Sequence, residues 1–126
     1  IEHVYKARME IERDRVSEVI QTLPLHGKLI LYAVLTLTRN RGSTTTGEVY
    51  SYYRRLCKRL GIESVTQRRA SDIVSELDML GLIDARIVSR GRYGKTRIIT
   101  LSVSPDAVEA ALLEDPQVKL AALHRD

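Results

Sequence analysis

The chain has 126 residues, of which 44% are hydrophobic, so it is long enough for one domain with a single compact core. No stretch of 18 apolar residues predicts a membrane span, so we expect no membrane partner, and the single cysteine, Cys57, excludes an internal disulfide. The sequence also lacks zinc-ligand spacings and the common phosphate-loop, metalloprotease and serine-hydrolase motifs. We therefore expect no metal site, no cofactor and no enzyme activity in this chain.

The formal net charge is +4, and the positive charge is concentrated in the centre of the chain. Residues 21–103 carry fourteen Lys and Arg against six Asp and Glu, whereas residues 1–20 and 104–126 are both slightly acidic. Such a basic centre favours a face that binds a polyanion. Charge alone leaves a merely solvated basic surface as an equal alternative.

The first third of the chain has a helical pattern. Residues 2–22 form either one long helix or two helices with a break near Asp14, which would cap the second. After a boundary at Leu23-Pro24, a second helix is expected to end near Asn40. Its apolar residues predict one buried face, formed by Leu29, Ile30, Ala33, Val34 and Leu37. The threonines at positions 44–46 then predict a short edge strand.

Two amphipathic helices separated by a tight turn follow. Thr45-x-x-Glu48 is a capping-box pattern, and the apolar stripe after it continues to Leu60 and is closed by Gly61. The stripe includes Cys57, which we expect to be a buried small hydrophobe. For the next helix, Ser64-x-x-Gln67 is a second capping box and Thr66 is a rival cap. That helix carries an apolar stripe from Ala70 to Leu80 and ends at Gly81.

The last third predicts a β-hairpin and two short helices. Residues 82–89 and 96–103 alternate with period two and predict strands with one buried face, formed by Ile83, Ala85, Ile87, Ile99, Leu101 and Val103. Ser104-Pro105 and Asp115-Pro116 each place a cap residue before a first-turn proline. The element order predicts a mainly α fold with a small β-hairpin (α+β), a winged helix-turn-helix with extra helices at both ends.

The helix after the turn carries the first group of candidate binding residues. Proteins with a helix-turn-helix read base edges with the first turns of this helix, and Arg and Gln match the edges of guanine and adenine. Ser64 or Thr66 offers a hydroxyl to a phosphate, and Asp72 is expected to pair with Arg68 or Arg69. The candidate residues for DNA binding are Ser64, Thr66, Gln67, Arg68, Arg69, Ser71 and Asp72.

The hairpin tip carries the second group. Residues 86–97 include five cations and no carboxylate, and two glycines let the backbone approach a surface closely. Arginine inserted into a narrow minor groove meets an enhanced negative potential. The candidate wing residues are Arg86, Arg90, Gly91, Arg92, Tyr93, Gly94, Lys95, Thr96 and Arg97. A solvated hairpin is the alternative.

Other cations form a third, weaker group. The outer face of the helix before the turn carries Arg54, Arg55, Lys58 and Arg59. These residues either flank DNA phosphates or form an ordinary solvated face. Arg39 and Arg41 are similar cases.

Several segments together resemble the C-terminal winged-helix domain of archaeal replication initiators, relatives of the eukaryotic origin recognition and cell-division-control initiators. The resemblance covers residues 14–115 and rests on order and spacing more than on any single motif. The matching segments are residues 23–31 (LPLHGKLIL), residues 47–50 (GEVY) with Tyr53 and Cys57, Gln67-Arg68-Arg69, residues 77–83, and residues 90–96 (RGRYGKT).

The resemblance implies more than the residues themselves. Members of this family carry an N-terminal AAA+ ATPase module and a lid, so residues 1–13 are expected to be the tail of that lid and residues 14–126 the winged-helix domain. ATP and Mg²⁺ are then expected only in the AAA+ region. The resemblance also implies origin repeats of double-stranded DNA as the partner, with the recognition helix in the major groove and the wing in the minor groove. Other replication proteins such as the replicative helicase are further possible partners, and the expected location is the cytoplasm, at the nucleoid.

Two alternatives remain open from the residues. A transcription regulator of the same fold would dimerise, and the terminal helices offer a surface for this. A protein-interaction module would use the winged helix without contacting nucleic acid, although the basic wing argues against it.

Overall fold

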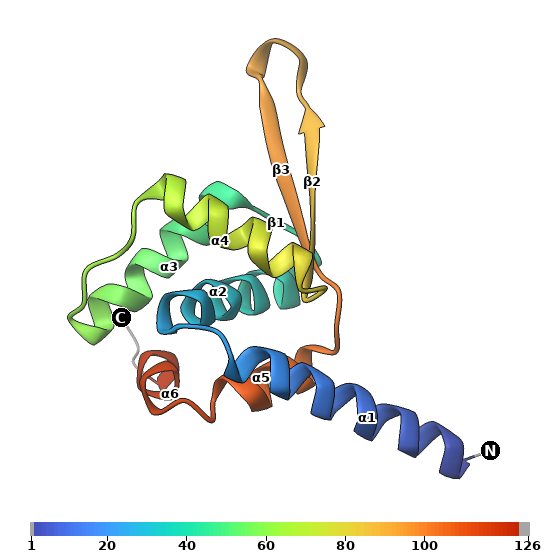
Figure 1. Ribbon diagram of the computed structural model, residues 1–126. Coiled ribbons are helices and arrows are strands. Elements are labelled where there is room, and N and C mark those ends of the chain that lie inside the picture. The colour runs from blue at the N-terminus through green and yellow to red at the C-terminus, as the bar shows by residue number, and fades with distance from the viewer. Residues whose placement is uncertain (1, 124–126) are drawn as a thin grey trace.

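The computed structural model describes residues 2–123; the predicted domain boundaries also include Ile1 and residues 124–126, which lie outside the described residues. The elements in chain order are α1 (Glu2–Gln21), α2 (Leu25–Arg41), β1 (Thr44–Thr45), α3 (Thr46–Leu60), α4 (Gln67–Met79), β2 (Ile83–Ser89), the 3₁₀ turn η1 (Gly91–Tyr93), β3 (Lys95–Leu101), α5 (Pro105–Leu112) and α6 (Pro116–Leu123) (Figure 1). The predicted α+β winged-helix fold with extra terminal helices is confirmed.

Helix α1 is continuous through Asp14, so of the two expected arrangements the structure has the single long helix. Its C-terminal half buries Val16 and Ile20. The same half is tied to α5, because the Gln21 amide donates to the Ala111 carbonyl oxygen at 3.2 Å. The N-terminal half extends away from the body of the domain (Figure 1).

Helix α2 is the centre of the core, and it is buried on more sides than its sequence pattern predicts. Its residues Leu29, Ile30 and Leu31 are all fully buried, although they are consecutive and therefore point to different sides of the helix. The reason is that α2 contacts α3, α4, α5, α6 and β3. The prediction of a single apolar face is therefore incomplete.

A buried ion pair accompanies this packing. Lys28 of α2 lies 3.0 Å from Asp115, which precedes α6, and both side chains are largely buried. Burial alone would raise the pKa of Asp115, but hydrogen bonds from Lys28 and from the Gln117 backbone outweigh it and hold the pKa below its ordinary value.

The helix ends around the turn follow the predicted capping signals. Thr45 is the N-cap of α3 and accepts a hydrogen bond from the Glu48 backbone at 3.2 Å. Gly61 ends α3 in the left-handed region with φ of 67°. Of the two candidate caps of α4, Ser64 and Thr66, the N-cap is Thr66, whose hydroxyl accepts a hydrogen bond from the Arg69 backbone N–H at 3.1 Å. Ser64 therefore lies in the turn, two residues before the cap.

The small sheet is antiparallel with the order β1-β3-β2, so β1 is the short edge strand that the threonines predict. The β2–β3 arm rises away from the helices (Figure 1). Ile83 and Ile99 are buried at its base, whereas Ile87 is 69% exposed. The prediction of one buried face along the whole hairpin is therefore wrong, because the strands extend beyond the helices that would cover them.

Candidate nucleic-acid interface

Helix α4 has one buried face and one exposed polar face, as expected of a recognition helix. Ala70, Ile73, Val74 and Leu77 are buried against the core. Gln67, Arg68 and Arg69 on the first turn are exposed, as is Asp72 one turn later. The free backbone N–H groups and the positive end of the helix dipole lie at the same turn, so the start of α4 is suited to an anionic or acceptor-rich ligand.

The ion pairing on α4 differs from the prediction. Arg69 pairs with Glu76, two turns further along the helix, with Nη1 and Oε1 3.1 Å apart. Within residues 2–123, Asp72 forms no ion pair, so the expected pair with Arg68 or Arg69 is wrong. The long arginine side chain reaches along the helix to Glu76. Arg68 has no carboxylate partner in the described part of the chain, so it is the cation on this turn with no competing charge.

A pair of tyrosines from α3 holds the turn that leads into α4. The Tyr53 hydroxyl accepts a hydrogen bond from the Val65 backbone N–H at 2.8 Å, and the Tyr50 hydroxyl donates to the Val65 carbonyl oxygen at 2.8 Å. His26 of α2 lies with Nδ1 2.7 Å from the Tyr53 hydroxyl. Both backbone polar groups of Val65, just before the Thr66 cap, are therefore fixed by α3.

Burial raises the pKa of Tyr53, so its hydroxyl stays protonated at neutral pH. The spacing of Tyr50 and Tyr53 along the sequence indicates that they lie on the apolar side of α3 but gives them no partner. The signal that could have revealed this role is chemical, because a buried tyrosine needs a hydrogen-bond partner for its hydroxyl.

Two predicted binding residues form the joint between the wing and α4. The Arg97 guanidinium donates to the Ser71 carbonyl and hydroxyl oxygens, both at 3.2 Å, and to the Ser75 hydroxyl at 2.6 Å. Arginine's planar fork fits this three-point contact, which fixes β3 against α4. A direct role of Ser71 and Arg97 in binding stays a prediction, and their observed hydrogen bonds are to each other and to Ser75.

The wing tip presents its cations to solvent. Gly91 and Gly94 have φ of 62° and 86°, which a side chain at either position would strain. Tyr93 is 79% exposed, and the Arg92 guanidinium lies 5.4 Å from the centre of its ring. Exposed residues at and beside the tip are Arg90, Gly91, Arg92, Tyr93, Gly94 and Lys95.

The two remaining wing candidates lie lower on the arm. Arg86 is paired with Asp84 at 2.8 Å, a carboxylate just outside the acid-free segment 86–97. Thr96 is half-buried and lines a hollow of about 520 Å³ between the wing and the start of α3. The hollow is also lined by Thr45, Thr46, Gly47, Ser71, Ile87, Lys95 and Arg97.

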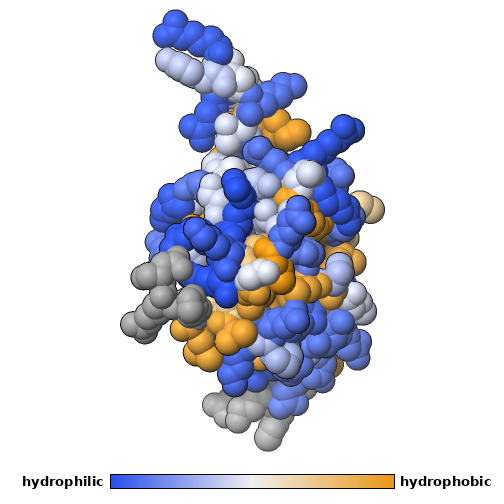
Figure 2. Space-filling model, turned by 90° about the vertical axis from the view of Figure 1, so that its left-hand side faces the viewer, coloured by the Kyte–Doolittle hydropathy of each residue, from blue (hydrophilic) through white to orange (hydrophobic). Residues whose placement is uncertain are grey.

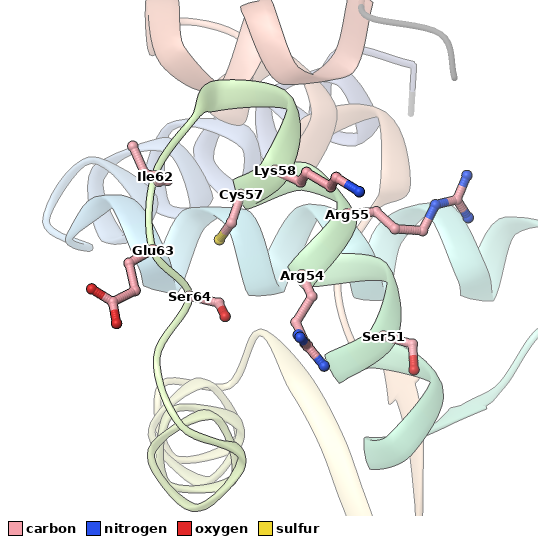
Figure 3. A pocket seen from close by; sticks show the side chains of 8 residues that line it. All are labelled: Ser51, Arg54, Arg55, Cys57, Lys58, Ile62, Glu63 and Ser64. Atoms are coloured by element: carbon pink, nitrogen blue, oxygen red, sulfur yellow. The ribbon is translucent and has the colours of Figure 1, made fainter.

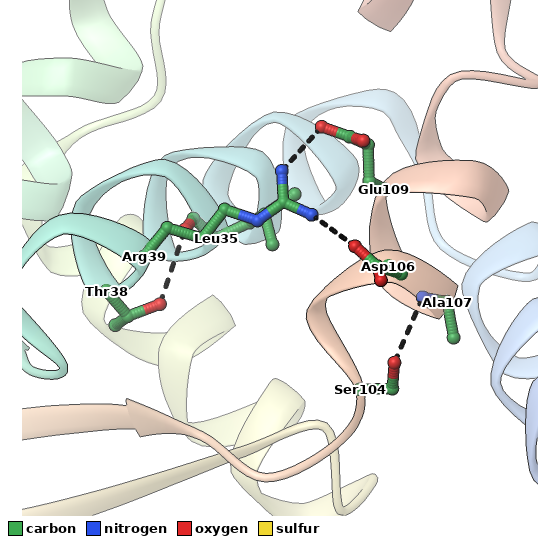
Figure 4. Close-up of polar contacts among 7 residues, drawn as sticks. All are labelled: Leu35, Thr38, Arg39, Ser104, Asp106, Ala107 and Glu109. Carbon is green, nitrogen blue, oxygen red and sulfur yellow. Dashed lines mark hydrogen bonds and ion pairs between the residues drawn. The ribbon is translucent and has the colours of Figure 1, made fainter.

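Several other basic residues form ion pairs or hydrogen bonds with other parts of the domain. Arg39 pairs with Asp106 at 3.0 Å and with Glu109 at 2.7 Å, which fastens α2 to α5 (Figure 4). Arg41 pairs with Glu48 and thereby lowers the pKa of that carboxyl. Arg59 donates to the Ala121 carbonyl oxygen of α6 at 3.1 Å. These contacts give the three arginines a structural role, whereas the sequence left contact with DNA phosphates and an ordinary solvated face as open alternatives.

Helix α4 and the wing, which carry these exposed cations, lie on the side of the domain opposite α1, α5 and α6 (Figure 1). Figure 2 shows the side that carries the α3–α4 turn, where hydrophilic side chains predominate over the wing and the upper part, and a hydrophobic area lies across the middle and lower part. Within residues 2–123, no group of three or more His, Cys, Asp or Glu residues is arranged to hold a metal ion, and no helix is long and apolar enough to cross a membrane.

Residues 18–111 match the protein family described as CDC6, C terminal winged helix domain. The chain belongs to this family. Among the relatives of this Cdc6-type domain is ORC1-type DNA replication protein 1 of Sulfurisphaera tokodaii, 57% identical over 124 residues, which are 98% of this chain and 31% of the relative. The protein of the same description from Aeropyrum pernix is 58% identical over 117 residues, which are 93% of this chain and 30% of the relative. The domain thus spans less than a third of the length of these curated relatives.

Solved structures agree with this assignment. The Cdc6-type domain is similar to the Aeropyrum pernix ORC1 protein, whose structure was solved in complex with DNA, with a TM-score of 0.89 and 57% identity over 94% of this chain and 31% of that chain. Drosophila ORC bound to DNA shares the fold, with a TM-score of 0.63 and 24% identity over 76% of this chain and 24% of that chain. The resemblance to the initiator family that the sequence motifs indicated is thereby confirmed.

Proposed function

We propose that this domain binds double-stranded DNA at replication origins with sequence preference, as the DNA-binding part of an archaeal replication initiator. The observation that carries the proposal is the common placement of two exposed basic elements, the first turn of α4 and the wing tip. Arg68 has no carboxylate partner among the described residues, and neither do Arg90, Arg92 and Lys95. The relationship to a protein whose structure contains DNA supports the same reading.

The two elements have different parts in this proposal. Gln67 and Arg68 on α4 contact base edges in the major groove, where a good bidentate pair discriminates by about 1–3 kcal/mol. The wing enters the minor groove, where Arg90, Arg92 and Lys95 meet phosphates and the negative groove potential. The Arg97–Ser71 joint and the tyrosine pair on Val65 fix the geometry between the two elements.

The rest of the relatives' length is also part of the proposal. We propose that ATP and Mg²⁺ bind in that remaining portion, and that contacts with the replicative helicase involve the assembled initiator. The DNA-binding step proposed here requires neither of them.

The test is the salt dependence of binding to an origin duplex and to a scrambled duplex of equal length, measured by fluorescence anisotropy. Three phosphate contacts, from Arg90, Arg92 and Lys95, predict a slope of about −2.7 in log K against log salt. Arg13→Ala on the exposed part of α1 serves as the control that removes one charge far from the interface. Equal affinity for both duplexes, or a slope near zero, would contradict the proposal.

A further inference from the structure

A basic trough lies on the outer face of α3, beside the turn into α4 (Figure 3). It has a volume of about 740 Å³. Its lining residues are Ser51, Arg54, Arg55, Cys57, Lys58, Ile62, Glu63 and Ser64. Three cations extend from α3 along one wall, and the turn supplies a hydroxyl and the single carboxylate of the lining. Cations combined with hydroxyl donors are the groups that contact phosphates in protein–DNA interfaces.

Two cations of this trough, Arg54 and Lys58, differ from the paired cations of the neighbouring elements. Lys28, Arg39 and Arg41 each have a carboxylate within ion-pair distance. In the part of the chain that the structure describes, neither Arg54 nor Lys58 has one, and Glu63 pairs with neither although it lines the same trough. A positive surface that the fold leaves uncompensated is suited to an anionic ligand.

The trough lies beside one end of the reading helix. It borders the N-terminal end of α4, and its residue Ser64 precedes the Thr66 cap by two positions. The wing joins the body near the opposite end of α4 (Figure 1). A helix of 13 residues is about 20 Å long, so the trough and the base of the wing flank the reading helix on either side. The basic surface therefore continues past α4 on the side away from the wing.

We propose that the α3 trough binds backbone phosphates of the duplex beyond the N-terminal end of α4 and so lengthens the DNA footprint on that side. This inference rests on the proposed function, because it requires a duplex seated on α4. Continuity with the α4 surface favours a duplex over an acidic protein segment. Arg54 is pre-positioned for a phosphate, because its guanidinium lies 5.9 Å from the centre of the Tyr50 ring and is partly ordered by it.

The experiment compares a duplex of about one and a half turns (about 15 base pairs) with duplexes extended by about one turn at one end or at the other. The test variant is Arg54→Gln/Lys58→Gln, which removes two charges and retains most of each aliphatic stem. The matched control is Arg13→Gln/Lys119→Gln, which removes two exposed charges on α1 and α6. Far-UV circular dichroism checks that both variants fold, as expected for exposed substitutions.

The wild-type domain should gain affinity from one extension and not from the other. On that extended duplex the salt slope should steepen by about 1.8, as two added phosphate contacts require. The test variant should bind the short duplex like the wild type but lose both the gain and the added slope. With that difference in slope, the ratio of wild-type to variant affinity for the extended duplex should decrease by about tenfold between 50 and 200 mM salt. The control variant should keep the gain.

Two results would overturn the inference. In one, the test variant binds the extended duplex as well as the wild type does. In the other, the test variant keeps the extended-duplex gain but loses binding to a poly-glutamate peptide, which would make the trough a site for an acidic protein segment. Failure of the proposed function is distinguishable from both, because the wild type would then show no preference for origin sequence even on the short duplex.

Discussion

Removal of one buried hydroxyl by Tyr53→Phe should loosen the turn that positions α4. The ring is fully buried and stays in place, so the substitution deletes only the atom that accepts from the Val65 N–H at 2.8 Å and meets His26 at 2.7 Å. A buried donor left without an acceptor costs about 1–3 kcal/mol. We expect the free energy of unfolding, measured by urea denaturation, to fall by that amount.

The effect of Tyr53→Phe on DNA binding distinguishes a role of Tyr53 in positioning α4 from a role in stability alone. Without its anchor the turn can shift, so Tyr53→Phe should reduce the preference for the origin duplex over a scrambled one more than it reduces binding to the scrambled duplex. Tyr50→Phe is the matched comparison, because it removes the other half of the tyrosine pair, frees the Val65 carbonyl oxygen and should cost about 0.5–1.5 kcal/mol. If Tyr53→Phe left both the unfolding free energy and the sequence preference at wild-type values, the tyrosine pair would not hold the turn.

Three further predictions test the frame around the interface. Thr66→Ala should destabilise the domain by about 1 kcal/mol in urea denaturation because it removes the α4 cap, whereas Ser64→Ala should have almost no effect, and equal losses would contradict the cap assignment. Asp115→Asn should cost about 3 kcal/mol at neutral pH because it leaves Lys28 buried without its partner. The folded pKa of Asp115 is depressed, so its stabilising contribution is present above its unfolded pKa of about 3.9 and is lost as pH falls through the folded pKa. The free energy of unfolding of Asp115→Asn should therefore fall less steeply with decreasing pH than that of the wild type. An identical pH profile would contradict this. Arg97→Lys should lower DNA affinity through a misplaced wing, with only about 1 kcal/mol lost in stability, and unchanged affinity would show that the Arg97 joint does not set the wing angle.

Local signals in the sequence were sufficient to predict the helices and strands around the interface. The Thr45 cap, the glycine after α3 and the proline at the start of α5 each act within a few residues, so their chemistry can be read from adjacent positions. The charge of the hairpin tip was equally visible. For this reason the helix-turn-helix and the wing could be placed without coordinates.

Long-range contacts account for what the sequence did not show. Arg97 and Ser71 are 26 residues apart, and His26 and Tyr53 are 27 apart, so no spacing rule connects them. The exposure of Ile87 depends on where the helices end below the wing, which a two-residue period cannot indicate. The Asp72 prediction was wrong because two acidic residues of α4, Asp72 and Glu76, lie within reach of Arg69, and Glu76 is the one that pairs with it.

The central claim is that α4 reads sequence while the wing grips the duplex, and the most direct test is the affinity of Arg68→Ala and Arg92→Ala for origin and scrambled duplexes. Arg68→Ala should weaken the origin complex by about 1–3 kcal/mol and leave the scrambled complex much less affected, so that sequence preference falls. Arg92→Ala should weaken both complexes alike and reduce the salt slope by about 0.9. Equal, sequence-independent losses from both variants would contradict the assignment of sequence reading to α4.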